Sequence, residues 1–180
     1  LTRKIVPSVD RTREGNFHLA ELRGVDVAKK TAGVVGTGRI GQHFIRMVKG
    51  MEMDVVAYDP HPNVAAAKEL GFRYVELDQL LQISDVVSLH APAVQETFHL
   101  LDARRLMLMK PSAFLINTAR GSLIDTQGLL VALEAGKLAG VGLDVLEEES
   151  IIKEERQLLA KHYQSDSEHQ TVVANQILLH

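Results

Sequence analysis

A glycine-rich motif near the start of the chain has the residue types and the spacing to bind a phosphate group. It has the form GxGxxG and consists of Gly36, Thr37, Gly38, Arg39, Ile40 and Gly41. An apolar run precedes it and a helical pattern follows it, which is the context in which this motif predicts a dinucleotide site. Gly36 permits a tight turn, Gly38 lets the backbone approach a pyrophosphate, and Gly41 lets the helix pack closely on the strand. We therefore expect a pyrophosphate on the N–H groups at the start of this helix, near Ile40 and Arg39, with the Arg39 side chain as a further contact.

An acidic residue completes this fingerprint. Asp59 follows the apolar run 55–58 and lies 18 residues after Gly41, which is the expected distance. A carboxylate at the end of this second strand can accept hydrogen bonds from the hydroxyls of an adenosine ribose and would repel the 2′-phosphate of NADP. One alternative is a glycine-rich turn beside an unrelated surface aspartate, but strand, helix and acid together favour a site for NAD. A second alternative is a Rossmann-type enzyme that uses S-adenosylmethionine, although Arg39 and the helix N-terminus suit a pyrophosphate better.

Three charged residues further along the chain follow apolar runs and face the same predicted edge. Arg120 follows the strongly apolar run 113–117, Asp144 ends the next run, and Glu149 comes five residues later. The guanidinium of Arg120 has the geometry to hold a substrate carboxylate at two points. From the residues alone, each of the three is either a functional group or an ordinary surface charge, and this choice stays open at this point.

Alternating strands and helices are needed to position these groups. The expected strands are 31–35, 54–58, 73–75, 86–90, 113–117 and 140–144. Helical patterns lie between them at 40–48, 64–70 and 77–81, and a further helix is expected from the N-cap residue Asp125 to a stop at Gly136. This alternation predicts an α/β fold, a doubly wound parallel sheet of the Rossmann type with helices on both faces and its ligand at the carboxyl ends of the strands.

Composition narrows the class of protein and its partners. The chain has 180 residues, a formal charge of −3 and no cysteine. The absence of excess positive charge argues against a nucleic-acid partner, and no apolar run reaches the ~18 residues of a membrane span. The lack of cysteine removes disulfides and thiolate metal sites and fits a reducing compartment, and no pair of histidines has a convincing metal-binding spacing. We expect a cytoplasmic protein that binds neither metal, membrane nor nucleic acid.

Two regions fall outside the alternating pattern. Residues 1–30 are expected to form a basic leader from the region between two domains, and apolar positions between 151 and 159 predict an amphipathic helix in a Glu-rich tail. The charged side chains of both regions are expected to be solvated, namely Arg11, Arg13, Arg23, Glu147, Glu154 and Glu155. The chain begins with Leu1 and ends inside an apolar pattern, so we expect residues 31–180 to be an NAD-binding domain cut before its last strand.

Five ordered motifs resemble the D-isomer-specific 2-hydroxyacid dehydrogenase family, and most closely its D-lactate dehydrogenase branch. They lie at residues 11–17, 36–41, 85–92, 117–121 and 143–149, and so cover nearly the whole chain. The resemblance implies a coenzyme domain that binds NAD. It also implies hydride transfer between NAD(H) and a small D-2-hydroxy or 2-keto acid, D-lactate and pyruvate in the first place. A homodimer built largely through the coenzyme domains is implied as well.

The same resemblance assigns roles to individual residues. The position of Arg120 orients the substrate carboxylate, that of Glu149 pairs with a catalytic histidine, and that of Asp144 contacts the nicotinamide carboxamide. The implied cofactor surface consists of Arg39, Ile40, Asp59, Ala91, Pro92, Thr97, Thr118 and Ala119. Two positions depart from the family pattern, because the stretch 94–98 is variable and Leu146 stands where an aromatic residue is common.

The catalytic histidine of the resembling family has no counterpart among the eight histidines of this chain. None of them fits the Pro-His or Gly-His context in which the family's catalytic histidine follows a further strand, because the one Pro-His pair, at residues 60–61, comes after the second expected strand. His90 ends a strand near the cofactor groove, where we expect a hydrogen-bonded histidine rather than an acid or base, and His99 is expected to be an ordinary surface residue. The chain is therefore expected to bind NAD without turnover. The alternative is an NAD(H)-sensing regulator of the same fold, such as a transcriptional corepressor.

Overall fold

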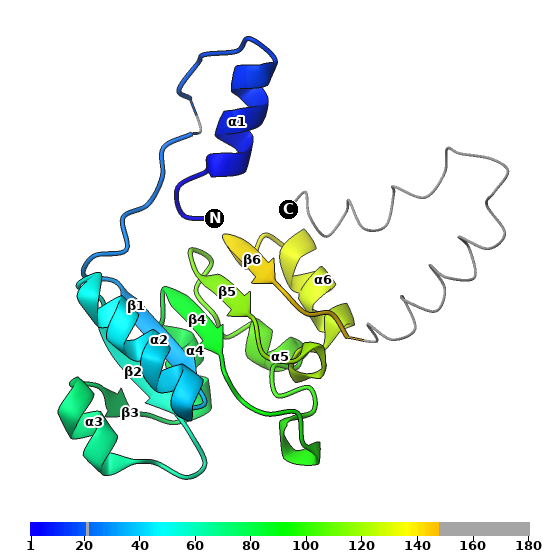
Figure 1. Ribbon diagram of the computed structural model, residues 1–180. Coiled ribbons are helices and arrows are strands. Elements are labelled where there is room, and N and C mark those ends of the chain that lie inside the picture. The colour runs from blue at the N-terminus through cyan, green and yellow to red at the C-terminus, as the bar shows by residue number, and fades with distance from the viewer. Residues whose placement is uncertain (21, 148–180) are drawn as a thin grey trace, which may run out of the picture.

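The computed structural model of the protein describes residues 1–20 and 22–147 (Figure 1). The strands among them are β1 (Thr31–Val35), β2 (Asp54–Tyr58), β3 (Arg73–Tyr74), β4 (Val86–Leu89), β5 (Phe114–Asn117) and β6 (Gly140–Leu143). The α-helices are α1 (Ile5–Arg13), α2 (Arg39–Gly50), α3 (Val64–Leu70), α4 (Leu77–Ile83), α5 (Ala103–Leu106) and α6 (Thr126–Glu134). Two short 3-10 turns, η1 (Gln95–Thr97) and η2 (Gly121–Leu123), complete the described elements.

The strands form one parallel sheet in the order β3-β2-β1-β4-β5-β6. The chain builds outward from β1 through β2 to β3, then crosses back to place β4 on the other side of β1. The carboxyl ends of β1 and β4 therefore lie where the strand order reverses, which is where open α/β sheets bind their ligands. Val35 pairs with both Tyr58 and Leu89, so the loops after β1, β2 and β4 leave the sheet at one level.

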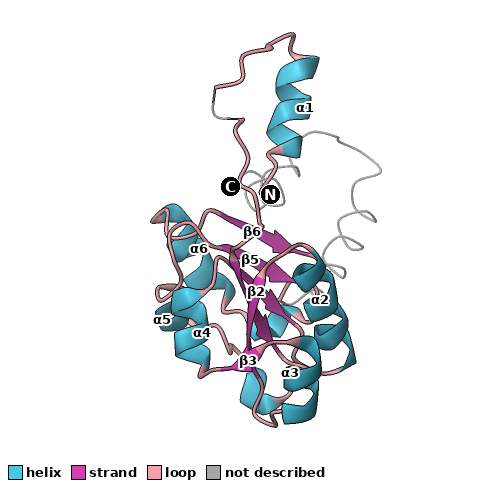
Figure 2. Cartoon of the chain, turned by 90° about the vertical axis from the view of Figure 1, so that its left-hand side faces the viewer, coloured by secondary structure: helices cyan, strands magenta, loops and turns pink. Residues whose placement is uncertain are grey.

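Helices cover both faces of the sheet, with α2 and α3 on one face and α4, α5 and α6 on the other (Figure 2). Each face buries its own apolar cluster. Val34 packs in the cluster that contains Ile45 of α2, whereas its neighbour Val35 packs in the cluster that contains Leu80 of α4. Successive side chains of a strand point to opposite faces, and here both faces are covered. This is why the strands read as continuous apolar runs rather than alternating ones.

Local sequence signals fix both ends of α3 and the start of α6. The Asn63 side chain caps α3 by accepting a hydrogen bond from the Ala66 N–H at 3.0 Å, and the helix stops at Gly71, whose φ is +68°. The Asp125 carboxylate caps α6 by accepting from the Gln127 N–H at 3.1 Å. The predicted N-cap at Asp125 is therefore confirmed.

The predicted doubly wound parallel sheet is confirmed, and all six expected strands are present. β3, β4 and β6 end one residue earlier than expected, and β5 begins one residue later. Helices α1 and α5 have no counterpart among the expected elements, because α1 buries none of its residues and α5 has only four. The amphipathic helix expected between 151 and 159 lies outside the described residues.

Most of the leader stands apart from the sheet (Figure 1), although the Leu1 side chain lies beside Gly140 and Gly142 of β6. Its helix α1 carries the exposed apolar side chains Ile5, Val6 and Val9. The chain returns to the sheet where the Lys29 N–H donates to the Glu52 carbonyl at 2.9 Å, and β1 begins at Thr31 as expected. Within the described ranges, no helix is both long enough and apolar enough to cross a membrane.

Candidate dinucleotide site

The glycine-rich loop joins β1 to α2 and is shaped by backbone contacts that leave no room for side chains. Gly36 has a φ of +92°, and a Cβ there would lie 2.8 Å from the carbonyl of His90. A Cβ on Gly41 would lie 2.1 Å from the carbonyl oxygen of Gly36. By contrast, a Cβ on Gly38 would meet nothing within 4 Å. The first and third glycines are thus required by the fold itself. The second, Gly38, leaves open space at the surface, where we expect a pyrophosphate to approach the backbone.

The N-terminus of α2 opens into this space. Gly38 is its N-cap residue and provides no side chain to cap the first N–H groups of the helix. The side chains of Arg39 and Ile40 are exposed, with Ile40 70% accessible. A twelve-residue helix with an uncapped, accessible N-terminus carries partial positive charge at that end. The arrangement suits a pyrophosphate, with Arg39 beside it.

Asp59 lies at the carboxyl end of β2, next to the loop. One carboxylate oxygen, Oδ2, accepts hydrogen bonds from the N–H of Thr37 at 2.7 Å and from its hydroxyl at 2.9 Å. The other oxygen, Oδ1, accepts from the His61 N–H at 2.9 Å. Partial burial raises the pKa of the Asp59 carboxyl, but these hydrogen bonds and the nearby His61 outweigh it and hold the pKa below its usual value. Asp59 is thus an ionised, fixed acceptor, and its contact with a ribose stays a prediction.

The loop after β4 forms the opposite wall of the glycine turn. His90 Nε2 lies 3.0 Å from the Ser88 hydroxyl oxygen, and burial lowers the pKa of the His90 imidazole. Ala91 is buried and Pro92 is exposed. The Thr97 hydroxyl donates within its own loop, to the Pro92 carbonyl at 2.6 Å and the Val94 carbonyl at 3.0 Å. Thr97 therefore shapes this loop, and a contact of Ala91, Pro92 or Thr97 with a cofactor stays a prediction.

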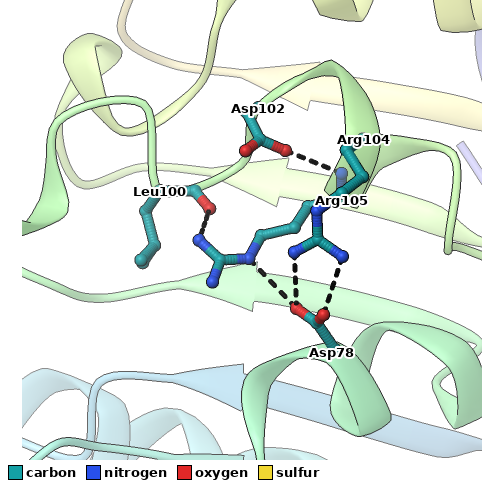
Figure 3. Close-up of polar contacts among 5 residues, drawn as sticks. All are labelled: Asp78, Leu100, Asp102, Arg104 and Arg105. Atoms are coloured by element: carbon teal, nitrogen blue, oxygen red, sulfur yellow. Dashed lines mark hydrogen bonds and ion pairs between the residues drawn. The ribbon is translucent and has the colours of Figure 1, made fainter.

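A cluster of charges holds the far end of this loop against helix α4 (Figure 3). Asp78, in the first turn of α4, accepts from Arg104 at 2.8 Å and from Arg105 Nε at 3.1 Å. The Arg105 guanidinium also donates to the Leu100 carbonyl at 3.0 Å, while Asp102 caps α5 through the Arg105 N–H. These hydrogen bonds lower the pKa of Asp78, although burial opposes them. The cluster fixes where the loop after β4 ends.

Arg120 is presented by a loop that a buried amide organises. Asn117 is 1% exposed, its side-chain N–H donates to the Arg120 carbonyl at 2.9 Å, and its side-chain oxygen accepts from the Ala119 N–H at 3.0 Å. The Arg120 side chain is exposed and donates only to the Ala119 carbonyl at 2.7 Å among the described residues. Thr118 is also exposed. The guanidinium is therefore placed at the carboxyl edge of the sheet with most of its donors available.

The segment after β6 is held by two residues that the sequence predicts to be solvated. His99 has a φ of +48°, and its ring stacks on Phe98 and contacts the carboxylate of Glu147. Glu147 also accepts from the N–H and hydroxyl of Thr126, at 3.3 and 2.7 Å. Burial raises the pKa of Glu147, but the hydrogen bonds from His99 and Thr126 outweigh it and lower that pKa overall. The expectation that His99 and Glu147 are ordinary surface residues is wrong.

The structure brings the predicted site residues to one edge of the sheet, with one exception. Asp144 is exposed directly after β6, and its N–H donates to the Asn117 carbonyl at 2.9 Å. Glu149 lies outside the described residues. The described ranges contain no group of three His, Asp or Glu side chains that could hold a metal ion. A hollow of about 450 Å³, lined by Lys49, Asp54 and Arg73 among others, lies at the amino ends of β1, β2 and β3, opposite the candidate site.

Sequence reasoning missed the residues that hold the site together. Asn117 and Thr37 lie inside the recognised motifs. Each is a polar residue at or just after the end of a buried apolar run, and this position could have indicated a structural role. The contacts of His99 and Tyr74 join residues 48 and 37 positions apart, so no local pattern could have shown them.

Comparison with known proteins agrees with a dinucleotide-binding domain. The sequence profile described as "D-isomer specific 2-hydroxyacid dehydrogenase, NAD binding domain" matches residues 1–169. D-lactate dehydrogenase of Escherichia coli is 46% identical over 149 residues, which are 83% of this chain and 45% of that protein. Glyoxylate reductase of Thermococcus litoralis is 41% identical over 162 residues, or 86% of this chain and 49% of that protein. The chain thus spans about half the length of these relatives.

Solved structures agree with the sequence matches. The crystal structure of D-lactate dehydrogenase from Aquifex aeolicus complexed with NAD and lactic acid superposes with a TM-score of 0.85 at 35% identity, covering 100% of this chain and 53% of that one. The apo structure of the Escherichia coli D-lactate dehydrogenase superposes with a TM-score of 0.77 at 44% identity, covering 84% of this chain and 49% of that one. The chain therefore belongs to the D-isomer-specific 2-hydroxyacid dehydrogenase family, as its NAD-binding domain.

Proposed function

We propose that this chain is the coenzyme-binding part of an enzyme that transfers hydride between NAD(H) and a small D-2-hydroxy or 2-keto acid, with D-lactate and pyruvate as the first candidates. The observation that carries the proposal is the loop after β1. It combines an open space at Gly38, an accessible helix N-terminus and the ionised Asp59 within hydrogen-bonding distance of the loop. Arg120 lies at the same edge of the sheet and supplies a group for an acidic substrate.

The residues of the loop fit a dinucleotide. When bound, NADH would supply the hydride for reduction of the keto acid, and NAD⁺ would accept it in the reverse direction. The N–H groups at the start of α2, with Arg39 and Ile40, would hold the pyrophosphate, and Asp59 would hold the adenosine ribose. Asp144 would hold the nicotinamide carboxamide. The remaining proposed cofactor residues are Gly36, Gly38, Gly41, Ala91, Pro92, Thr97, Thr118 and Ala119.

Arg120 would bind the substrate carboxylate. Its guanidinium carries five N–H donors in a planar fork, of which one donates to the Ala119 carbonyl. Two parallel hydrogen bonds to a carboxylate fix the orientation of a small acid, so that the C2 atom is presented for reduction. Glu149 would pair with a histidine of the whole protein and raise its pKa, which keeps the imidazolium able to donate a proton to the substrate oxygen.

An activity assay tests this proposal. The protein that carries this chain should reduce pyruvate with NADH, and should do so with a higher kcat/KM than with NADPH. Glyoxylate is the informative second substrate, because a matched relative is a glyoxylate reductase. Failure to reduce either acid, by a folded protein that binds NADH, would contradict the proposed activity and leave an NAD(H)-sensing regulator. No observation on the described residues favours that alternative.

We also propose that the protein forms a homodimer through its coenzyme domain, with the leader at the interface. Helix α1 buries none of its residues, and the large apolar side chains of Ile5, Val6, Phe17 and Leu19 are 66–83% exposed. Exposed apolar side chains in one segment favour an interface. Val6→Asp should lower the sedimentation coefficient to that of a monomer, whereas Val131→Asp, at an exposed apolar site on α6, should not. An unchanged sedimentation coefficient for Val6→Asp would contradict this interface.

We place the protein in the cytoplasm and assign it no nucleic-acid partner. The chain has no cysteine, which fits a reducing compartment, and its net charge of −3 gives no electrostatic attraction to phosphates. Expression of the tagged protein followed by fractionation tests the compartment. Recovery in a secreted fraction would contradict the assignment.

A further inference from the structure

A chain of hydrogen bonds, which we call the relay, runs from Tyr74 at the edge of the sheet through Thr37 to Asp59. It starts at Tyr74 on β3, whose hydroxyl oxygen accepts from the Asn63 N–H at 3.0 Å and lies 2.8 Å from the Thr37 hydroxyl oxygen. The Thr37 hydroxyl in turn lies 2.9 Å from Asp59 Oδ2. Thr37 follows β1, Asp59 follows β2, Tyr74 lies on β3 and Asn63 caps α3, and the sheet order β3-β2-β1 brings them together.

The direction of every hydrogen bond in this chain is determined by chemistry. The Asn63 N–H can only donate, so the Tyr74 oxygen accepts from it. The Asp59 carboxylate can only accept, so the single proton of the Thr37 hydroxyl is directed to Oδ2. The Tyr74 hydroxyl must then donate to the Thr37 oxygen. All protons therefore point toward Asp59, and each bond polarises the next one.

The two hydroxyls of the relay are held in place by packing. Thr37 is 4% exposed, and the Tyr74 ring packs edge-on against Phe72 with ring centroids 5.2 Å apart. Tyr74 also pairs with Ala57 in the sheet, two residues before Asp59. A buried hydroxyl that loses its partner cannot replace it with water at no cost. The relay is therefore a fixed part of the loop.

The hydrogen bonds of Thr37 occupy Oδ2 of Asp59 and leave Oδ1 with a free acceptor site. A carboxylate has about four lone-pair sites. Thr37 uses the two on Oδ2, and the His61 N–H uses one on Oδ1. One site on Oδ1 is left for a ligand, which matches a single hydrogen bond from a ribose hydroxyl.

We propose that Tyr74 and Thr37 are positioning residues for dinucleotide selectivity, because they fix Oδ2 of Asp59 in the loop and present Oδ1 to the adenosine ribose. This inference rests on the proposed function, in which the ribose of NAD binds at Asp59. NADPH carries a phosphate on the 2′ oxygen and so has no 2′-hydroxyl to donate a hydrogen bond to Oδ1. Its binding should therefore depend less on the position of Oδ1. Disturbing the relay should therefore weaken NADH binding more than NADPH binding.

Four variants of the full 180-residue chain test this inference, with the Kd for NADH and for NADPH measured by fluorescence titration. Tyr74→Phe and Thr37→Val each remove one hydroxyl of the relay. Each should raise the Kd for NADH by about 3–10-fold, the equivalent of one neutral hydrogen bond, and the Kd for NADPH by less than about 2-fold. Thr37→Ser keeps the hydroxyl and should bind both cofactors like the wild type. Tyr58→Phe removes a tyrosine hydroxyl that has no hydrogen-bond partner among the described residues, and should also behave like the wild type.

An NADH analogue that lacks the 2′-hydroxyl of adenosine sharpens the test. It should bind the wild type more weakly than NADH does, and this penalty should shrink in Tyr74→Phe, as coupling between the hydroxyl and the relay requires. An equal loss for NADH and NADPH in Tyr74→Phe would show a merely structural role and overturn the inference. If Tyr74→Phe fails to fold, as judged by circular dichroism, the comparison of Thr37→Val with Thr37→Ser decides in its place.

The failure of the relay and the failure of the proposed function give different results. If a folded wild type shows no saturable binding of NADH, both are wrong. If Asp59→Asn changes the preference between NADH and NADPH while Tyr74→Phe and Thr37→Val do not, the Asp59 site stands and the relay is overturned.

Discussion

Two regions at the carboxyl edge of the sheet, around Asp59 after β2 and around Arg120 after β5, differ in how fully the protein fixes their charged side chains. On the β2 side, every polar atom of the Asp59 carboxylate already accepts a hydrogen bond from the protein. On the β5 side, Asn117 organises the backbone of the loop but leaves the Arg120 guanidinium exposed. We infer from this difference that the described residues alone fix the Asp59 carboxylate on the proposed cofactor side, whereas Arg120, on the proposed substrate side, needs further groups to enclose a ligand.

The largest expected effect belongs to the substrate side. Arg120→Gln in the protein that carries this chain should lower kcat/KM for pyruvate by about 10²–10⁴-fold, because two charge-assisted hydrogen bonds are lost. The Kd for NADH should change by less than about 3-fold, since Arg120 is not part of the glycine-rich loop. Arg39→Gln is the matched control and should mainly weaken NADH binding. If Arg120→Gln weakened NADH binding as much as it lowered kcat/KM for pyruvate, Arg120 could not be assigned to the substrate rather than to the cofactor.

The next effect concerns the packing of the cofactor side. Gly41→Ala places a methyl group 2.1 Å from the Gly36 carbonyl oxygen, which is backbone and cannot move aside. The free energy of unfolding, measured by urea denaturation, should fall by about 1–3 kcal/mol. Gly50→Ala is the matched control, because Gly50 ends the same helix and a Cβ there meets nothing within 4 Å. Equal stability of the two variants would contradict the tight loop.

A smaller effect is expected for cofactor preference. Asp59→Ala removes the charge that repels a 2′-phosphate and the acceptor for the ribose, so the ratio of the Kd for NADPH to that for NADH should fall by roughly 10-fold. Asp54→Ala, at the exposed amino end of the same strand, should leave the ratio unchanged. An unaltered ratio in Asp59→Ala would mean that another residue sets the preference.

The smallest effect tests the contact between the segment after β6 and the rest of the chain. The pKa of Glu147 is lower in the folded protein than its ordinary value of 4.5, so the folded state binds this proton more weakly than the unfolded state. The resulting stabilisation is present above that value and is lost as the pH falls through the lower pKa of the folded state. Glu147→Gln should therefore reduce the free energy of unfolding by about 1 kcal/mol at pH 6, and by much less near pH 3.

Glu134 provides the control for this pH dependence. It is exposed at the end of α6 and forms no ion pair among the described residues, so Glu134→Gln should leave the free energy of unfolding at pH 6 nearly unchanged. A Glu147→Gln effect of the same size at both pH values would show that the charge of Glu147 does not stabilise the segment.

The sequence predicts the framework well because the framework rests on local patterns. The strands are apolar runs buried on both faces, and the helix caps at Asn63 and Asp125 are short-range signals. The glycine positions follow from a short motif, although the close approach at Gly36 involves the backbone of His90, far away in the sequence. Helix α1 was not predicted because it lies outside the alternating pattern of strands and helices, and its apolar residues Ile5, Val6 and Val9 stay exposed.

The supports of the candidate site could not be predicted in the same way. The contacts Tyr74–Thr37 and His99–Glu147 depend on which strands become neighbours, and that information is spread over the whole chain. His99 shows the difficulty clearly, because a left-handed backbone and a half-buried ring have no signature in a histidine flanked by Phe98 and Leu100. Sequence motifs thus predicted candidate ligand-binding residues, but they did not predict the residues that hold these candidates in place.

The most direct test of the dinucleotide site is an NADH titration of the folded 180-residue chain beside its Gly38→Ala variant. A Cβ on Gly38 meets no protein atom within 4 Å, so the variant should unfold at nearly the same urea concentration as the wild type. The wild type should bind NADH saturably, and Gly38→Ala should bind it more weakly because the added methyl group occupies the space of the pyrophosphate. Absence of saturable binding to the folded wild type, or equal affinity of the two proteins, would contradict a pyrophosphate seat at this loop.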